Sequence, residues 1–110
     1  MAENPGYTVK SVESIAVGSD VQARIFTLAP GEEIPWHFHS NVADWYLVTE
    51  GTLSIETRAP ADRQALSAGA TYRIPAKTAH LISNRSAGDT RFLLVQGVGP
   101  YDFIKVAAAR

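Results

Sequence analysis

The sequence contains no cysteine. This absence excludes disulfide bonds, thiolate nucleophiles, zinc fingers and iron–sulfur clusters, so any bound metal must be held by nitrogen and oxygen ligands. An excess of charge of one sign is also missing, because 10 Lys plus Arg stand against 11 Asp plus Glu. The basic residues are scattered singly, whereas nucleic-acid binding usually requires a clustered basic face. We therefore expect no nucleic-acid partner.

Long apolar runs are absent as well. No stretch approaches the ~20 apolar residues of a membrane span, and the first ten residues lack the basic-then-apolar plan of a signal peptide. The sequence thus predicts a cytoplasmic chain without a membrane partner. Its 110 residues, 45% apolar and 19% charged, have the size and balance of one globular domain. We expect a single domain over residues 1–110.

Glycine and proline divide the chain into short runs rich in Val, Ile, Leu, Thr and aromatic residues. These runs predict strands at Val21–Leu28, Asp44–Thr49, Thr52–Thr57, Thr71–Ile74, Arg91–Gln96 and Tyr101–Val106. Short strands at this spacing indicate an all-β sandwich or barrel. A helix is expected at most as a turn or two near Val12–Val17. The Glu50-Gly51 step predicts a hairpin, because glycine adopts the positive φ of a tight bend.

The three histidines of the chain form the main chemical signal. His37 and His39 are two residues apart, so on a strand both imidazoles point to the same face. Asp44 follows after a short bend, and His80 comes from a distant segment beyond the turn at Pro75. A His-x-His pair alone is often just two exposed polar residues. Three imidazoles and a carboxylate arriving together are a plausible metal site.

In the spacing of these residues the sequence resembles the cupin superfamily. Residues 31–51 fit its first motif, G-x5-H-x-H-x3/4-E-x6-G, and residues 69–84 fit its second, G-x5-P-x-G-x2-H-x3-N, with two departures. Asp44 stands in place of the usual glutamate and can ligate only if the backbone approaches by roughly 1 Å; otherwise it would orient a ligand. Lys77 stands in place of a turn glycine and is tolerated if its φ is negative.

The resemblance implies an all-β fold, a cupin-type double-stranded β-helix or jelly-roll barrel, forming a single cupin domain. It also implies a divalent transition metal held by His37, His39, Asp44 and His80. Four protein ligands leave two positions open on a six-coordinate ion, which favours Mn, Fe or Ni. A tetrahedral Zn ion would have an open coordination position only if Asp44 does not bind it.

The function implied by the resemblance is that of a dioxygenase, decarboxylase or isomerase. Its substrate would be a small oxygen-rich molecule that chelates the metal. The alternative is a noncatalytic module that binds a metal or a small ligand, because no general base besides the ligands is evident. A hydrolase built on Ser40 is a weak third reading, since the chain has no Gly-x-Ser-x-Gly elbow.

Side-chain alternation suggests which residues surround this site. With Asp44 facing inward, Tyr46 also faces inward and is the candidate for a hydroxyl near the metal, although a core tyrosine is equally consistent. The chemical type of other residues suggests further roles at the site. Those that could line the cavity are Phe26, Tyr72, Phe92 and Gln96, and those that could bind a carboxylate are Arg24, Arg73 and Arg91.

The same alternation predicts an apolar outer face made of Trp36, Phe38, Trp45 and Leu47. Such a face is too large to remain solvated in a monomer. Small cupins commonly dimerise, so we expect a homodimer.

Overall fold

The computed structural model describes residues 7–107. This part of the chain forms ten strands and no helix, and so contains no helix able to cross a membrane. The strands are β1 (Ser11–Val17), β2 (Val21–Leu28), β3 (Glu33–Phe38), β4 (Ala43–Glu50), β5 (Thr52–Thr57), β6 (Asp62–Ser67), β7 (Thr71–Ile74), β8 (His80–Ser83), β9 (Thr90–Gly97) and β10 (Ile104–Lys105).

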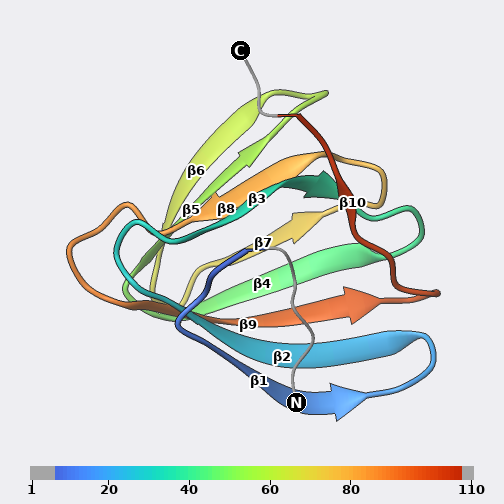
Figure 1. Ribbon diagram of the computed structural model, residues 1–110, viewed down its shortest axis with the longest axis horizontal. Coiled ribbons are helices and arrows are strands. Elements are labelled where there is room, and N and C mark those ends of the chain that lie inside the picture. The colour runs from blue at the N-terminus through green and yellow to red at the C-terminus, as the bar shows by residue number, and fades with distance from the viewer. Residues whose placement is uncertain (1–6, 108–110) are drawn as a thin grey trace.

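The strands form two five-stranded antiparallel sheets. Sheet I has the order β1-β2-β9-β4-β7, and sheet II has the order β10-β3-β8-β5-β6. The sheets converge at the left of Figure 1 and diverge toward the right, where the segment after β9 passes from one to the other. Because β3, β4 and β5 alternate between the sheets, the chain winds around the barrel. The expected all-β, double-stranded β-helix fold is confirmed.

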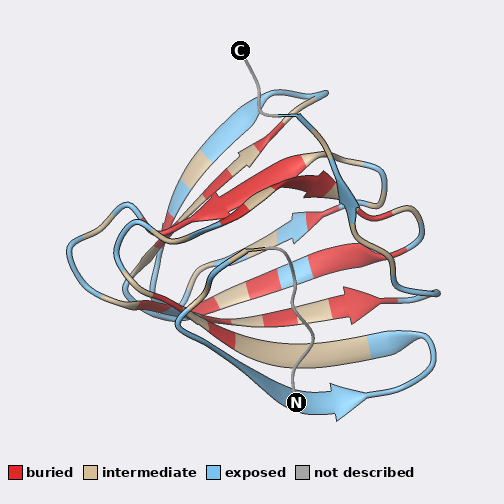
Figure 2. Ribbon diagram, in the orientation of Figure 1, coloured by how far each residue is buried: buried red, intermediate tan, exposed pale blue. Residues whose placement is uncertain are grey.

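The core lies between the sheets, where alternate residues of facing strands are buried (Figure 2). Phe26 of β2 and Phe92 of β9 are register partners and stack with ring centroids 5.3 Å apart. Burial of each such side chain contributes about 1.5–3 kcal/mol to the free energy of folding. The edge strand β1 is exposed along its whole length.

The hairpin predicted at Glu50-Gly51 is wrong. β4 pairs with β7 and β9, whereas β5 pairs with β6 and β8, so this turn carries the chain from sheet I to sheet II. Gly51 does adopt a positive φ, +78°. The glycine signal identified a sharp turn correctly, but adjacent strands in sequence need not pair when the chain winds around a barrel.

Two other local predictions are corrected. The segment near Val12–Val17 is strand β1, not helix, since its backbone pairs with β2. The run Tyr101–Val106 forms only the two-residue strand β10, which pairs with the end of β3. We call residues 98–106 the C-terminal strap. This segment crosses from sheet I to sheet II, and most of it has no regular secondary structure (Figure 1).

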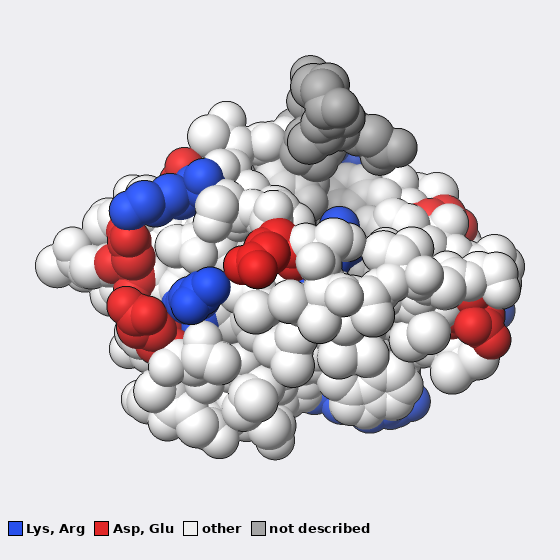
Figure 3. Space-filling view, turned by 90° about the horizontal axis from the view of Figure 1, so that it is seen from below, with Lys and Arg blue, Asp and Glu red and all other residues white. Residues whose placement is uncertain are grey.

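Charged side chains do not segregate by sign on the face shown in Figure 3. Lys and Arg lie there among Asp and Glu. Ion pairs on the surface of the protein include Lys10–Asp89 (2.5 Å) and Arg91–Glu13 (3.6 Å). Exposed pairs of this type contribute little to stability, so they chiefly balance surface charge.

Candidate metal centre

The structure brings His37, His39, Asp44 and His80 together in the interior. All four are at most 3% exposed, and their potential ligand atoms lie within 4.8 Å of one another. His37 on β3 and His80 on β8 are direct register partners in sheet II, and His39 follows just after β3. Asp44 comes from β4 of sheet I, so the cluster joins the two sheets.

Each imidazole is fixed by a backbone carbonyl. His37 Nδ1 lies 2.6 Å from the carbonyl oxygen of Pro35, and His80 Nδ1 lies 2.8 Å from that of Thr78. His39 Nδ1 lies 2.6 Å from a carbonyl oxygen of the C-terminal strap. Since a carbonyl only accepts, each Nδ1 must carry a proton, which leaves the Nε2 lone pair of the neutral ring free. This is the orientation that metal-ligating histidines require.

The backbone of β3 explains one of these contacts. The register of β3 against β8 is irregular between Ile34 and His37, and Pro35 lies at that irregularity. Proline has no N–H to contribute to the strand pairing, so a bulge is a favourable place for it. The bulge leaves the Pro35 carbonyl available to His37, two residues on.

The short Asp44 side chain reaches the histidines. Its Oδ2 lies 3.2 Å from His80 Nε2 and 3.4 Å from His39 Nε2. Ligands about 2.1 Å from one ion lie roughly 3 Å apart when adjacent, so these spacings suit a shared ion. His80 Nε2 is buried and has no hydrogen-bond partner among residues 7–107. A buried lone pair without a partner, facing a carboxylate, fits a cation between them.

Two further side chains hold the Asp44 carboxylate. The Tyr46 hydroxyl donates to Oδ2 at 2.8 Å, and Gln96 Nε2 donates to Oδ1 at 3.0 Å. Gln96 is the register partner of Asp44 on β9, which explains how their side chains meet. Both carboxylate oxygens are thereby oriented, as second contacts of a metal ligand usually are.

Burial and neighbouring charge shape the protonation of the cluster. Burial, with His80 nearby, lowers the pKa of His37 to about 3, so this ring is neutral at neutral pH. Burial would raise the pKa of Asp44, but the adjacent His39 and His80 imidazoles outweigh it and hold that pKa well below its usual range. Burial and the Asp44 carboxylate raise the pKa of Tyr46, which therefore remains a hydrogen-bond donor.

The C-terminal strap packs against the histidines. The Phe103 ring stacks on His37 with centroids 4.1 Å apart, and the Tyr101 ring lies 5.3 Å from His39. The Asp102 side chain accepts a hydrogen bond from the Ser40 backbone N–H at 2.7 Å, which ties the strap to the loop after β3. Sequence reasoning missed these residues because nothing in their spacing links them to the histidines.

Only some of the other residues expected around the site contact the cluster. Phe26 and Phe92 stack on each other in the core, and Gln96 contacts the cluster as described. Tyr72 instead bridges the open edge between the sheets, where its hydroxyl donates to Asp62 at 2.8 Å. Tyr46 faces inward as expected, and its hydroxyl is bound to the carboxylate.

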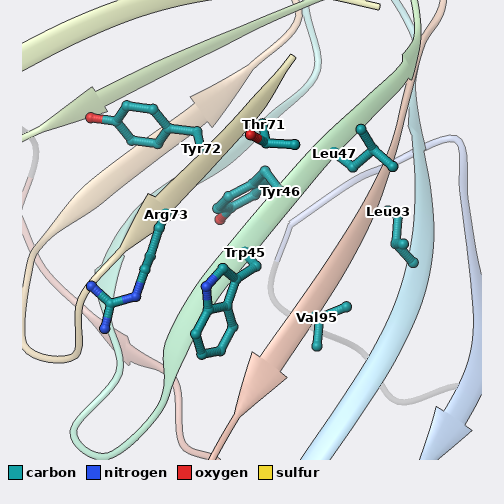
Figure 4. A pocket seen from close by; sticks show the side chains of 8 residues that line it. All are labelled: Trp45, Tyr46, Leu47, Thr71, Tyr72, Arg73, Leu93 and Val95. Atoms are coloured by element: carbon teal, nitrogen blue, oxygen red, sulfur yellow. The ribbon is translucent and has the colours of Figure 1, made fainter. Parts of the chain in front are cut away.

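The prediction that Trp36, Phe38, Trp45 and Leu47 form one outer face is wrong. Trp36 and Phe38 belong to sheet II, whereas Trp45 and Leu47 belong to sheet I. The Trp36 ring is covered by the Arg58 guanidinium, 4.1 Å from its centroid. Trp45 and Leu47 instead line a shallow groove of about 600 Å³ on the outer side of sheet I (Figure 4). Alternation gave the outward direction correctly but could not show that β3 and β4 part into different sheets.

The three candidate arginines also separate. Arg73 lies over the Trp45 ring at the outer groove, and Arg91 pairs with Glu13 on the surface. Arg24 alone of the three contacts a residue of the cluster's surroundings, because it donates to the side-chain oxygen of Gln96.

The second motif ends at a structural residue. Asn84 is fully buried, and its amide donates to the carbonyls of Leu28 (2.9 Å) and Gly88 (2.7 Å). Its Oδ1 accepts from the backbone N–H of Ser86 at 2.9 Å. The Asn84 side chain therefore joins the end of β2 to the loop at residues 86–88, and its hydrogen bonds are not with the histidines.

Lys77 does not meet the condition for replacing the motif glycine without strain, because its φ is positive, +68°. Its N–H donates to the carbonyl of His39 at 2.7 Å, so this turn connects the two histidine-bearing segments. A left-handed conformation costs a residue with a side chain about 1–2 kcal/mol relative to glycine. The departure from the motif is therefore tolerated at some loss of stability.

Lys77→Gly is expected to stabilise the protein by about 0.5–1 kcal/mol. Relief of the left-handed strain exceeds the extra conformational entropy of glycine in the unfolded chain. Urea unfolding measures the difference, and Ala76→Gly in the same turn is the matched control, expected to destabilise because Ala76 has no positive φ to relieve. Equal destabilisation by both substitutions would contradict the assignment.

Comparison with solved structures shows what the fold resembles. A protein of unassigned function with a double-stranded β-helix domain from Klebsiella pneumoniae subsp. pneumoniae superposes with a TM-score of 0.75 at 20% identity, over 86% of this chain and 82% of that one. A protein containing a cupin-2 domain from Shewanella frigidimarina gives 0.67 at 26% identity, over 82% of each chain. Oxalate decarboxylase of Bacillus subtilis, as a serine-to-alanine mutant, gives 0.72 at 20% identity, over 80% of this chain and 24% of that one.

The family comparison is more specific. No curated protein matches the chain, but the family model of the cupin domain matches residues 24–96, which include all four clustered residues and both motifs. Because this match extends over more than half of the sequence, the chain belongs to the cupin domain family.

Proposed function

We propose that His37, His39, Asp44 and His80 bind a divalent transition metal and that the protein is a metalloenzyme. One observation supports this most strongly. Three buried imidazoles have their Nδ1 atoms fixed by carbonyls and lie around one carboxylate, and the Nε2 atom of His80 has no hydrogen-bond partner in the part of the chain that the structure describes. An apolar side chain would fill this space at lower free-energy cost if the cluster had only a structural role.

The metal we favour is Mn, Fe or Ni. Three imidazole nitrogens and one carboxylate oxygen suit all three, and a six-coordinate ion with four protein ligands keeps two positions for a substrate. Zn remains compatible with the same ligands. A metal bound here would act as a Lewis acid toward a carbonyl, carboxylate or hydroxyl group.

The surrounding residues orient and shield these ligands. Tyr46 and Gln96 fix the Asp44 carboxylate, so that its remaining lone pairs face the histidines. Tyr101 and Phe103 of the strap cover the imidazoles and limit the access of water. Together these contacts preorganise the site, so little side-chain entropy is lost on metal binding.

The substrate class follows from the open positions. We propose a small oxygen-rich molecule that chelates the metal, transformed by a dioxygenase, decarboxylase or isomerase reaction. One solved structure with this fold is an oxalate decarboxylase, which is compatible with this class. We further propose that residues 1–110 are one domain working in the cytoplasm.

A noncatalytic binding module is the second candidate. The cluster is at most 3% exposed, and the groove of about 600 Å³ lies on the outer side of sheet I rather than at the histidines. A closed centre of this kind suits a bound ligand that is not turned over.

Turnover assays separate the two candidates. Fe-loaded protein is tested for O₂ consumption, and Mn-, Ni- and Fe-loaded protein for loss of keto and hydroxy acids, with His37→Ala as the matched control lacking one ligand. The enzyme proposal predicts turnover that disappears in the variant. Stoichiometric metal with no turnover on any compound would favour the binding module.

We also propose that the outer side of sheet I forms a homodimer interface. Opposed residues of antiparallel strands share a face, so six apolar residues form two adjacent rows across β2, β9 and β4. The rows are Ile25, Leu93 and Leu47, and Ala23, Val95 and Trp45. Trp45 is 41% exposed in the isolated chain, and burying it against a second copy would remove a large apolar area from water.

Light scattering tests the dimer. At micromolar concentration the unaltered chain is expected to have twice the mass of the monomer, and Val95→Glu is expected to shift it to a monomer by placing a charge in the row. Ser54→Glu, on a strand of sheet II, is the control and should remain dimeric. A monomeric unaltered chain would exclude the proposal.

A further inference from the structure

Arg24 is an arginine that faces the interior between the sheets. Its register partner on β9 is Leu94, whose own partner on β4 is Tyr46, and both of these side chains are buried. Directly opposed residues of antiparallel strands point to the same face. Arg24 therefore lies on the inner face of sheet I, in the row next to Asp44.

A single amide separates the Arg24 guanidinium from the cluster. Its Nη2 donates to the side-chain oxygen of Gln96. The nitrogen of the same amide donates to Asp44 Oδ1 at 3.0 Å and lies 3.3 Å from His39 Nε2. Gln96 thus sets the spacing between the guanidinium and the proposed metal ligands.

The charge of Arg24 is not balanced by an acidic side chain. No carboxylate within residues 7–107 lies within 4.0 Å of its nitrogens. The carbon of the guanidinium lies over the Phe26 ring, 5.0 Å from its centroid, and over the Tyr101 ring, 5.6 Å from its centroid. Its Nε is buried and has no hydrogen-bond partner within the described residues. Burying a cation and an unpaired N–H donor costs desolvation free energy, unless an anion pairs with the charge and accepts the hydrogen bond.

The proposed metal centre carries a net positive charge, as the Arg24 guanidinium does. Metal-bound imidazoles are neutral, and a divalent ion outweighs the single carboxylate of Asp44. Arg24 adds a second positive charge beside it. An anionic ligand is therefore favoured over a neutral one at this place in the barrel.

We propose that Arg24 binds a carboxylate group of the small molecule that the centre takes, so that this molecule is an organic acid with a second oxygen group directed at the metal ligands. The planar guanidinium can donate two parallel hydrogen bonds to a carboxylate, and its free Nε is one of the donors suited to that pairing. This inference rests on the proposed metal centre and names the class of its ligand.

Among the described residues, Arg58 is the other arginine whose buried Nε lacks a hydrogen-bond partner, but it cannot take this role. Its guanidinium lies over the Trp36 ring, and its Nη2 donates to the carbonyl of Ala107 at 2.6 Å. Trp36 adjoins His37 on the same strand, so its side chain points to the opposite, outer face of sheet II. Arg58 is thus on the far side of that sheet from the cluster.

Calorimetric titration with matched acids and amides tests the role of Arg24. Malonate, succinate and glutarate, with malonamide, succinamide and glutaramide as their neutral counterparts, are titrated into metal-loaded and metal-free protein. Arg24→Gln removes the charge and keeps a polar side chain, and Arg85→Gln, an exposed surface arginine, is the control. Thermal unfolding confirms that both variants are folded.

One of the three diacids should best span the separation that Gln96 sets between the Arg24 guanidinium and the proposed metal ligands. This diacid is expected to bind the unaltered chain and Arg85→Gln with equal affinity, and Arg24→Gln with an affinity at least about tenfold lower. Its diamide should bind weakly to all three. The affinity for Mn²⁺ or Ni²⁺ should change by less than about threefold in Arg24→Gln, because Arg24 contacts Gln96 and not one of the proposed ligands themselves. Equal diacid affinity in Arg24→Gln, diamides as tight as diacids, or no diacid binding to the unaltered chain would each overturn the proposal.

Failure of the metal centre is recognised separately. If the unaltered chain binds no metal, the proposed function fails in the metal titration itself. The metal-free arm then still decides about Arg24, since the difference in diacid affinity between the unaltered chain and Arg24→Gln does not need the metal.

Discussion

Replacing His80 by alanine is expected to weaken binding of a divalent metal by more than about 100-fold. Even residues that only orient a ligand change metal affinity 10–100-fold when replaced, and His80 would contribute a ligand atom itself. Its Nε2 is buried, has no hydrogen-bond partner in the described residues 7–107, and lies 3.2 Å from Asp44 Oδ2. Titration with Mn²⁺, Ni²⁺ or Zn²⁺ measures the change.

Ser83→Ala is the matched control for His80→Ala. Ser83 is 4% exposed and lies on the same strand, β8, but it is not one of the clustered ligands. It should bind metal as the unaltered chain does. The chain has only three histidines, all in this cluster, so no other imidazole can replace the lost ligand. Unchanged affinity in His80→Ala would show that the metal binds elsewhere.

Replacing Gly51 by alanine is expected to destabilise the fold by about 3 kcal/mol or more. Gly51 has a φ of +78°, and a Cβ built there would lie 2.5 Å from the carbonyl oxygen of Asp89 and 3.0 Å from the Cα of Thr90. The left-handed strain of about 1–2 kcal/mol adds to the displacement of packed backbone, about 1–3 kcal/mol. Urea unfolding gives the difference.

Two other motif glycines provide the control. Gly31 and Gly69 also have positive φ, +86° and +93°, but no atom lies within 4 Å of a Cβ built on either. Alanine there should cost only the left-handed strain, about 1–2 kcal/mol. If all three substitutions destabilise equally, the close approach of the β4–β5 turn to the chain preceding β9 is not what requires Gly51.

Only part of the histidine cluster follows from local geometry. Two residues on one strand share a face whatever the fold, which placed His37 and His39 together. Asp44 and His80 needed the family spacing, because their approach depends on how β4 and β8 are placed in opposite sheets. The structure also shows that the aspartate, although shorter than the usual glutamate, comes within 3.4 Å of two imidazoles.

What depends on the path of the chain between sheets could not be predicted. A glycine turn between two apolar runs indicates a hairpin in an ordinary sheet, but Gly51 separates strands of different sheets. For the same reason Trp36 and Trp45, both correctly expected to face outward, lie on different surfaces. The contacts of Arg24 and Asp102 join segments more than 60 residues apart, and no short-range pattern signals them.

Elemental analysis tests the central claim most directly. The protein is purified without chelators and without a histidine tag, incubated with Mn²⁺, Fe²⁺ or Ni²⁺, and freed of unbound metal before measurement, with His37→Ala and Asp44→Ala alongside. The account predicts about one ion per chain in the unaltered protein and loss of the ion in both variants. Folded protein without metal, or metal retained equally in His37→Ala, would contradict it.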